Sequence, residues 1–255
     1  MLPLLLFTNI PGDPDESPVR TIHVFVALCD NQHQGIVQVP AFLGNGDDPA
    51  RNLYWGALYG VKTRLKKNRD WKLLSCLEDE SEDILERCVF KHAKENIFCV
   101  ADAYRGKSIK RALMDFIGAS AGRSKKKAHI KAGGNMLTIP CGGSSHLVCY
   151  LGHNGLMDFS LDVLPEKQDA EERDAVILAC ASKSFFSHPL KIAGAQPLLW
   201  TTGLLAPEAY ILEAVFAGWT AGEKAEDIVF RAAKAYARYQ GCSLRAAQHL
   251  FTTGW

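Results

Sequence analysis

The chain has 255 residues, of which 47% are hydrophobic and 22% are charged, and its formal net charge is +1. This composition is typical of a globular protein with one large core or two small ones. The near-neutral charge provides no general electrostatic attraction to nucleic acid or to an anionic membrane, so neither is an expected partner. No apolar run is long enough to cross a bilayer.

The N-terminal stretch MLPLLLF is apolar but short, and no basic flank precedes it. A polar stretch broken by prolines follows, which argues against a secretory signal. We expect residues 1–20 to form a loose arm or an extra edge strand, and residues 21–255 to form a single domain.

Short apolar strands alternate with helical stretches along the chain. The predicted strands are residues 21–29, 71–77, 97–104, 146–152, 175–182 and 197–203. The predicted helices are residues 51–67, 81–94, 108–122, 207–219 and 223–240. Nearly continuous apolar strands separated by helices predict an α/β fold, in which helices cover both faces of a mainly parallel six-stranded sheet. The stretch 122–145, rich in Gly, Lys and Ser, predicts a long loop within the domain.

The eight cysteines predict free thiols rather than a disulfide scaffold, because several lie in apolar runs and no Cys-x-x-Cys pair occurs. We therefore expect a reducing, cytoplasmic location. One group has the composition of a zinc site: Cys141, His146, Cys149 and His153. On a strand, however, His146 and Cys149 would face opposite sides, so no metal is predicted.

Two chemically reactive side chains follow neighbouring predicted strands. His153 follows the strand 146–152, and Cys180 lies near the end of the strand 175–182. In parallel sheets, ligands bind beyond the carboxyl ends of the strands. A thiolate is a strong nucleophile, and an imidazole can assist its formation or protonate a departing amine. Each residue alone would be typical of a core cysteine or a turn histidine, whereas together they predict a catalytic pair.

Two blocks carry a resemblance to a known family: HLVCYLGHNG (146–155) and AVILACAS (175–182). They resemble the clan CD cysteine peptidases, which include caspases, metacaspases and clostripain. In that family one apolar block ends in His-Gly, and a later block ends in Ala-Cys or Ser-Cys. The resemblance covers roughly residues 20–240 and implies a caspase-like three-layer αβα sandwich.

The resemblance implies a cysteine endopeptidase, a hydrolase of the thiol protease class. Cys180 corresponds to the nucleophile and His153 to the general acid–base residue. The backbone amide of Gly155 or of Asn154, with that of Cys180, is expected to bind the oxyanion of the tetrahedral intermediate.

By the same resemblance, Asp47 and Asp48 lie where metacaspase-like members receive a basic side chain before the scissile bond. In the alternative interpretation, the two aspartates belong to a turn and cap the next helix. Trp200 and Thr201, on the last predicted strand, are expected to wall a subsite and to pair with an extended peptide, although such tryptophans are more often core residues. The expected partner is a protein or peptide substrate, and a regulatory partner or homodimer stays open.

No cofactor is predicted, because the Asp-rich loops contain no recognisable calcium motif, although calcium activates some relatives. Two alternatives to a peptidase stay open. The first is a catalytically inactive, caspase-like binding or signalling module, because Asn154 separates His153 from Gly155 where the family has His-Gly. The second is a different α/β enzyme or a nucleotide-binding protein, in which Cys180 is a core residue.

Overall fold

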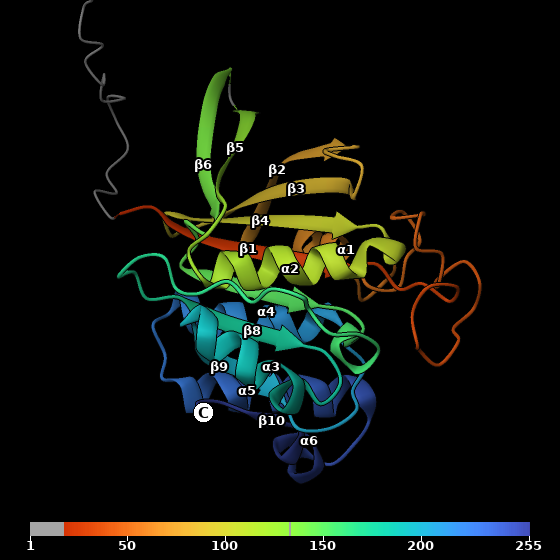
Figure 1. The fold of residues 1–255 in the computed structure, drawn as a ribbon. Helices are drawn as coiled ribbons and strands as arrows, with labels where there is room; N and C mark the ends of the chain where they lie inside the picture. Colours follow the sequence, from red (N-terminus) through yellow and green to blue (C-terminus); the bar gives the residue numbers. More distant parts are fainter. Residues whose placement is uncertain (1–17, 133) are drawn as a thin grey trace, which may run out of the picture.

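A mixed eight-stranded sheet lies at the centre of the computed structural model, which describes residues 18–132 and 134–255 (Figure 1). The strands are β1 Arg20–Ala27, β2 Trp71–Glu78, β3 Ile84–His92, β4 Ile97–Tyr104, β5 Lys125–Ala132, β6 Asn135–Gly142, β7 Leu147–Leu151, β8 Asp174–Leu178, β9 Gln196–Thr201 and β10 Phe251–Thr252. The order across the sheet is β10-β9-β8-β7-β1-β4-β3-β2, and β5 and β6 pair separately. The strands from β9 to β4 in this order are parallel, and antiparallel strands complete both edges.

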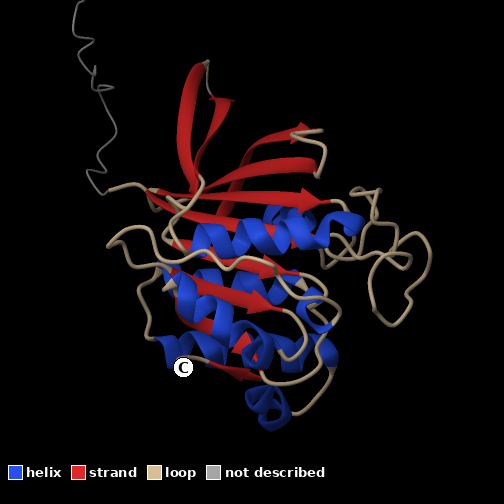
Figure 2. Cartoon of the chain, in the orientation of Figure 1, coloured by secondary structure: helices blue, strands red, loops and turns tan. Residues whose placement is uncertain are grey.

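Helices cover both faces of this sheet (Figure 2). They are α1 Val61–Lys67, α2 Ile109–Ser120, α3 Ser182–Ala193, α4 Ala209–Thr220, α5 Ala225–Gln240 and α6 Leu244–Leu250. Buried side chains of α2 and α3 pack on one face, and those of α1, α4 and α5 pack on the other. The predicted α/β class, with a mostly parallel sheet, is therefore confirmed.

The central strands are apolar over nearly their whole length because both of their faces are covered. Every residue of β7 is buried, as is every residue of β8 after Asp174. The six predicted strands are confirmed in β1, β2, β4, β7, β8 and β9. The predicted number of strands is wrong, because β3 and β10 also join the sheet.

The predicted helix over residues 81–94 is wrong, because this segment contains β3, which pairs with β2 and β4. Its charged residues favour an exposed helix when the sequence is considered alone. In the structure, however, Glu86 and Arg87 are only 4% and 6% exposed. Glu86 accepts a hydrogen bond from the indole of Trp55, and Arg87 pairs with Asp102. Buried partners thus satisfy charges that would otherwise require solvent.

The predicted loop over residues 122–145 is also wrong, because it contains the antiparallel hairpin β5–β6. Small and branched apolar residues alternate with lysines on β5, and Ala128 and Ile130 face inward. With Ile139 of β6 they form a small third core cluster on β3 and β4. The hairpin therefore covers part of the sheet.

The remaining helix predictions were correct at 108–122, 207–219 and 223–240, which contain α2, α4 and α5. The predicted helix 51–67 is limited to α1 at its end. Neither α3 nor α6 was predicted. Pro189 lies inside α3, and an internal proline removes one backbone hydrogen bond, so the sequence pattern gives little sign of a helix there.

Most of the predicted N-terminal arm, residues 1–20, lies outside the described residues. In the described part of the chain, no helix is long and apolar enough to span a membrane. Cys76 and Cys88 are opposite each other on β2 and β3 and form a disulfide, contrary to the expectation of free thiols. Because disulfides are typical of oxidising compartments, the cytoplasmic location stays a prediction.

The long segment between β1 and α1, residues 28–60, is tied to the end of β1 by side-chain hydrogen bonds. The buried Asn52 accepts from the Cys29 amide and donates to the Cys29 carbonyl, at 3.0 and 2.8 Å. Gln34 donates to the carbonyls of Leu28 and Gly106. These bonds hold the segment 28–60 in place beside the carboxyl ends of the parallel strands.

Candidate active site

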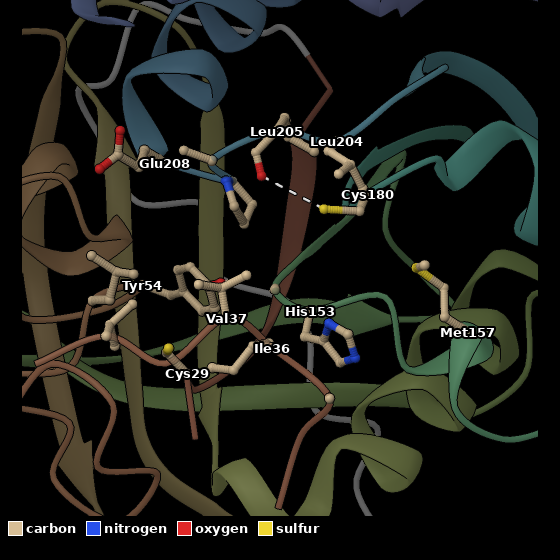
Figure 3. A pocket seen from close by; sticks show the side chains of 16 residues that line it. Cys29, Ile36, Val37, Tyr54, His153, Met157, Cys180, Leu204, Leu205 and Glu208 are labelled. Carbon is tan, nitrogen blue, oxygen red and sulfur yellow. Dashed lines mark hydrogen bonds between the residues drawn. The ribbon is translucent and has the colours of Figure 1, made fainter. Parts of the chain in front are cut away.

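A cavity of about 540 Å³ opens at the carboxyl ends of β1, β7 and β8 (Figure 3). Four segments form it: the loop after β1, the turns after β7 and β8, and the loop 204–208 before α4. Volumes of this size are typical of small-molecule and side-chain binding sites. His153 and Cys180 both line the cavity, and Figure 3 shows them on the same side of it.

Sheet register explains why these two residues meet. Leu151 of β7 is paired with Leu178 of β8, and His153 and Cys180 each lie two residues beyond that pair. Parallel strands end at the same edge, so both residues arrive at one rim. Both residues line one cavity, as their positions after paired strands lead one to expect, but no hydrogen bond in the described residues joins their side chains. The Cys180 thiol instead donates to the Leu205 carbonyl, at 3.6 Å.

His153 is held by an acidic residue that the sequence reasoning did not identify. Its Nε2 lies 2.6 Å from Oδ2 of Asp158, and the same carboxylate oxygen accepts the Gly35 amide at 3.3 Å. Because a carboxylate only accepts hydrogen bonds, Nε2 is the donor of this contact. The hydroxyl of Tyr150 donates to the His153 carbonyl at 2.7 Å. Asp158 thus orients the imidazole, and Tyr150 holds the backbone of the same residue.

Gly35 permits the approach of Asp158. A Cβ atom at this position would lie 2.7 Å from Asp158 Oδ1, which is too close for any real side chain. The two residues are far apart in sequence, and Asp158 follows the short 3-10 turn Gly155–Met157. No sequence pattern marks this contact, because it depends on how the two loops fold against each other.

Cys180 lies in a sharp turn between β8 and α3. The next residue, Ala181, has left-handed backbone angles, φ 47° and ψ 36°. For a residue other than glycine this conformation costs roughly 1–3 kcal/mol and is often found at functional sites. The turn is stabilised by the Ala181 amide, which donates to the Gly203 carbonyl, and by the Ser182 amide, which donates to Thr201 Oγ1. This turn leaves the Cys180 side chain half-buried at the cavity surface.

The residues predicted to form the oxyanion hole lie beside the catalytic pair but do not line the cavity. The Gly155 amide donates to the His153 carbonyl at 3.1 Å. The buried Asn154 side chain donates to the Cys180 carbonyl at 2.6 Å and accepts the Leu156 amide. Asn154 thus links the two turns, and the oxyanion role of these residues stays a prediction.

The predicted substrate-binding residues are placed away from the cavity. Asp47 pairs with Arg105 and Asp48 pairs with Arg51, each at 2.7 Å. Thr201 is buried and donates to the Ala179 carbonyl. Trp200 is also fully buried. None of these four residues lines the cavity, although Thr201 bonds to the turn that carries Cys180.

The four residues considered for a zinc site are also separated. Cys141 belongs to the cluster under the β5–β6 hairpin, Cys149 lies in the core behind β7, and His146 accepts the Thr21 amide. Among the described residues, the group with metal-ligand geometry is Cys76, Glu86 and Cys88. Two of its members form the disulfide.

Besides Tyr54, two further titratable residues line the cavity, Cys29 and Glu208. Burial raises the pKa of the Cys29 thiol to about 11, so this cysteine stays protonated and is not a nucleophile near neutral pH. Burial also raises the pKa of Glu208, whose carboxylate accepts a hydrogen bond from Gln240 at 2.9 Å. Neither residue was predicted, because neither belongs to a motif.

No protein-family model, curated protein or solved structure matches the chain. Its function is therefore inferred from this cavity and from the residues that line it.

Proposed function

We propose that the protein is a cysteine endopeptidase, with Cys180 as nucleophile and His153 as general acid–base residue. The observation that carries the proposal is that both side chains, from the ends of paired parallel strands, line one cavity. The caspase-like resemblance of the two sequence blocks supports the same pair. The strained turn at Ala181 adds support, because it orients the residue before it.

The reaction begins when the Cys180 thiol gives its proton to His153, and the thiolate attacks the peptide carbonyl and forms a carbon–sulfur bond. The oxyanion is stabilised by the Cys180 amide, and α3 begins two residues later, so its dipole adds partial positive charge nearby. The imidazolium of His153 protonates the amine as the carbon–nitrogen bond breaks. Water, deprotonated by His153, then attacks the thioester, releasing the acid and restoring the thiol.

One contact favours a second candidate, a catalytically inactive binding module. The Cys180 thiol donates to the Leu205 carbonyl rather than to His153. In an active peptidase the loop 204–208 must therefore release the sulfur when substrate binds. In an inactive module this contact would be permanent.

Replacement of His153 by alanine tests the proposal. We expect the rate of peptide cleavage to fall by about 10²- to 10⁴-fold, because the general acid is lost. The measurement is the appearance of new amino termini in a complex peptide pool, followed by mass spectrometry. His188→Ala is the matched control, since His188 is exposed on α3 and does not line the cavity. No cleavage by the wild type, or equal cleavage by His153→Ala, would contradict the proposal.

Asp158 is proposed to position His153, and Asp158→Asn should lower kcat by about 10- to 100-fold with little change in KM. The amide keeps the shape of the carboxylate but offers Nε2 a weaker, neutral acceptor. Asp162→Asn is the control, because Asp162 is exposed and pairs with Lys110 outside the cavity. A change in KM alone would indicate substrate contact instead of positioning.

A further inference from the structure

The walls of the catalytic cavity are almost entirely apolar. Ile36, Val39 and Leu53 contribute from the segment 28–60 between β1 and α1. Leu205 and Pro207 contribute from the loop before α4. Figure 3 shows Ile36 and Leu205 among the side chains that surround the same space as His153 and Cys180. A cavity lined in this way disfavours a charged group that has no oppositely charged partner there, because desolvation of an unpaired charge is costly.

The rim of the cavity is apolar as well. Val37 is 91% exposed, Leu204 is 75% exposed and Met157 is 46% exposed, and they come from three different segments. Isolated exposed apolar residues are common, but three around the mouth of one cavity form a patch that a ligand can cover. The rim therefore extends the apolar surface beyond the cavity itself.

The carboxylates near the cavity are already engaged. Asp47 and Asp48 pair with arginines outside it. Glu208 is bound by Gln240, and Figure 3 shows its carboxylate turned away from Cys180. Asp158 is occupied by His153 and by the Gly35 amide. Of these four carboxylates, only that of Glu208 belongs to a residue that lines the cavity, and it points away from Cys180 (Figure 3).

We infer that the cavity accepts a large apolar side chain, such as Leu or Phe, from the residue that precedes the scissile bond. This inference rests on the proposed peptidase function and differs from the basic residue that the sequence resemblance implies. The substrate carbonyl lies at Cys180, its side chain fills the space between Ile36, Leu53 and Pro207, and the exposed rim covers the neighbouring part of the peptide. Each methylene that fits an apolar pocket of this kind contributes about 10-fold or more to discrimination.

The test uses peptidyl acyloxymethyl ketones that are identical except for the residue next to the ketone, which is Leu, Phe, Lys or Asp. The full chain is incubated with each probe, and the rate of Cys180 modification is measured by mass spectrometry. The expected result is that the Leu or Phe probe reacts at least 10-fold faster than the Lys and Asp probes. Val37→Arg should reduce the rate of the preferred probe severalfold. Val163→Arg is the matched control, because Val163 is exposed but lies outside the cavity.

The possible results separate the two hypotheses. If the Lys or Asp probe reacts fastest, or if all four react equally, the apolar inference is wrong and the nucleophilic role of Cys180 is retained. If no probe modifies Cys180, the peptidase function is wrong and the inference fails with it.

Discussion

Cys180→Ala is expected to reduce peptide cleavage by at least about 10⁴-fold, because no other cysteine of the cavity can replace the nucleophile. Cys29 also lines the cavity, but burial raises the pKa of its thiol to about 11. Cys180 is half-buried, and its thiol makes one hydrogen bond, to Leu205. The free energy of unfolding should therefore change by only about 1 kcal/mol. The measurement combines cleavage of the peptide pool with urea unfolding of both proteins.

Cys242→Ala is the matched control for this variant. Cys242 is also a partly buried free cysteine, but it lies between α5 and α6 and does not line the cavity. Its replacement should leave the cleavage rate within about twofold of wild type. Residual cleavage by Cys180→Ala at the wild-type rate would show that another residue performs the chemistry.

The second large effect concerns stability: Asp102→Asn should lower the free energy of unfolding by about 3–5 kcal/mol. Asp102 is fully buried on β4. Arg87 donates to both of its oxygens, at 2.6 and 2.7 Å, and His23 Nε2 lies 3.0 Å from it. Asparagine would leave the Arg87 guanidinium buried without a full counter-charge. Urea unfolding at pH 7 gives the measurement.

The same carboxylate predicts a dependence on pH. Burial alone would raise the pKa of Asp102, but the hydrogen bonds from Arg87 and His23 outweigh it and hold the pKa well below its usual range. The carboxylate is therefore charged more readily in the folded than in the unfolded chain. Its stabilisation is present above the unfolded pKa of about 3.9 and is lost as the pH falls below it. Between about pH 5 and about pH 3, the free energy of unfolding should fall further for the wild type than for Asp102→Asn.

Asp47→Asn is the control for both measurements. Asp47 pairs with Arg105 at 2.7 Å, but its side chain is 54% exposed, so solvent screens the pair. An exposed ion pair of this kind contributes only about 0–1 kcal/mol. Equal destabilisation by the two variants would contradict the role assigned to burial at Asp102.

That His153 and Cys180 reach the same edge of the sheet could be predicted from the sequence, because it depends on simple geometry. Apolar blocks identify β7 and β8, and parallel strands bring their carboxyl ends to one edge. His153 and Cys180 follow from that reasoning alone. Asp158 could not be predicted in this way, because its contact with His153 depends on a short turn and on a glycine in a distant loop.

The errors in the predicted fold have a related cause. The charged residues Glu86 and Arg87 of β3 bond to partners outside β3, so a segment that is polar in sequence is buried in the structure. The position of the segment 28–60, which lines one side of the cavity, likewise depends on Asn52, whose side chain bonds to the backbone of Cys29. Long-range side-chain pairing of this kind leaves no periodic pattern in the sequence. The shape of the cavity was therefore not predictable, although its position was.

The register of β7 and β8 has a consequence for how the chain can vary. His153 and Cys180 each follow the Leu151–Leu178 pair by two residues, so their separation is set by the spacing of adjacent strands, about 4.8 Å, and by the two turns. The connection that joins them includes residues 162–172, most of which are exposed, and it does not set that separation. Some of these residues are anchored: the Lys167 and Gln168 amides donate to the Ile192 and Ala121 carbonyls, and Asp169 pairs with Arg173 and Lys125. A change of length in the unanchored part of the connection costs mainly loop-closure entropy, which grows slowly with length. The number of residues between His153 and Cys180 can thus change in that part of the connection while both residues stay at the same edge of the sheet.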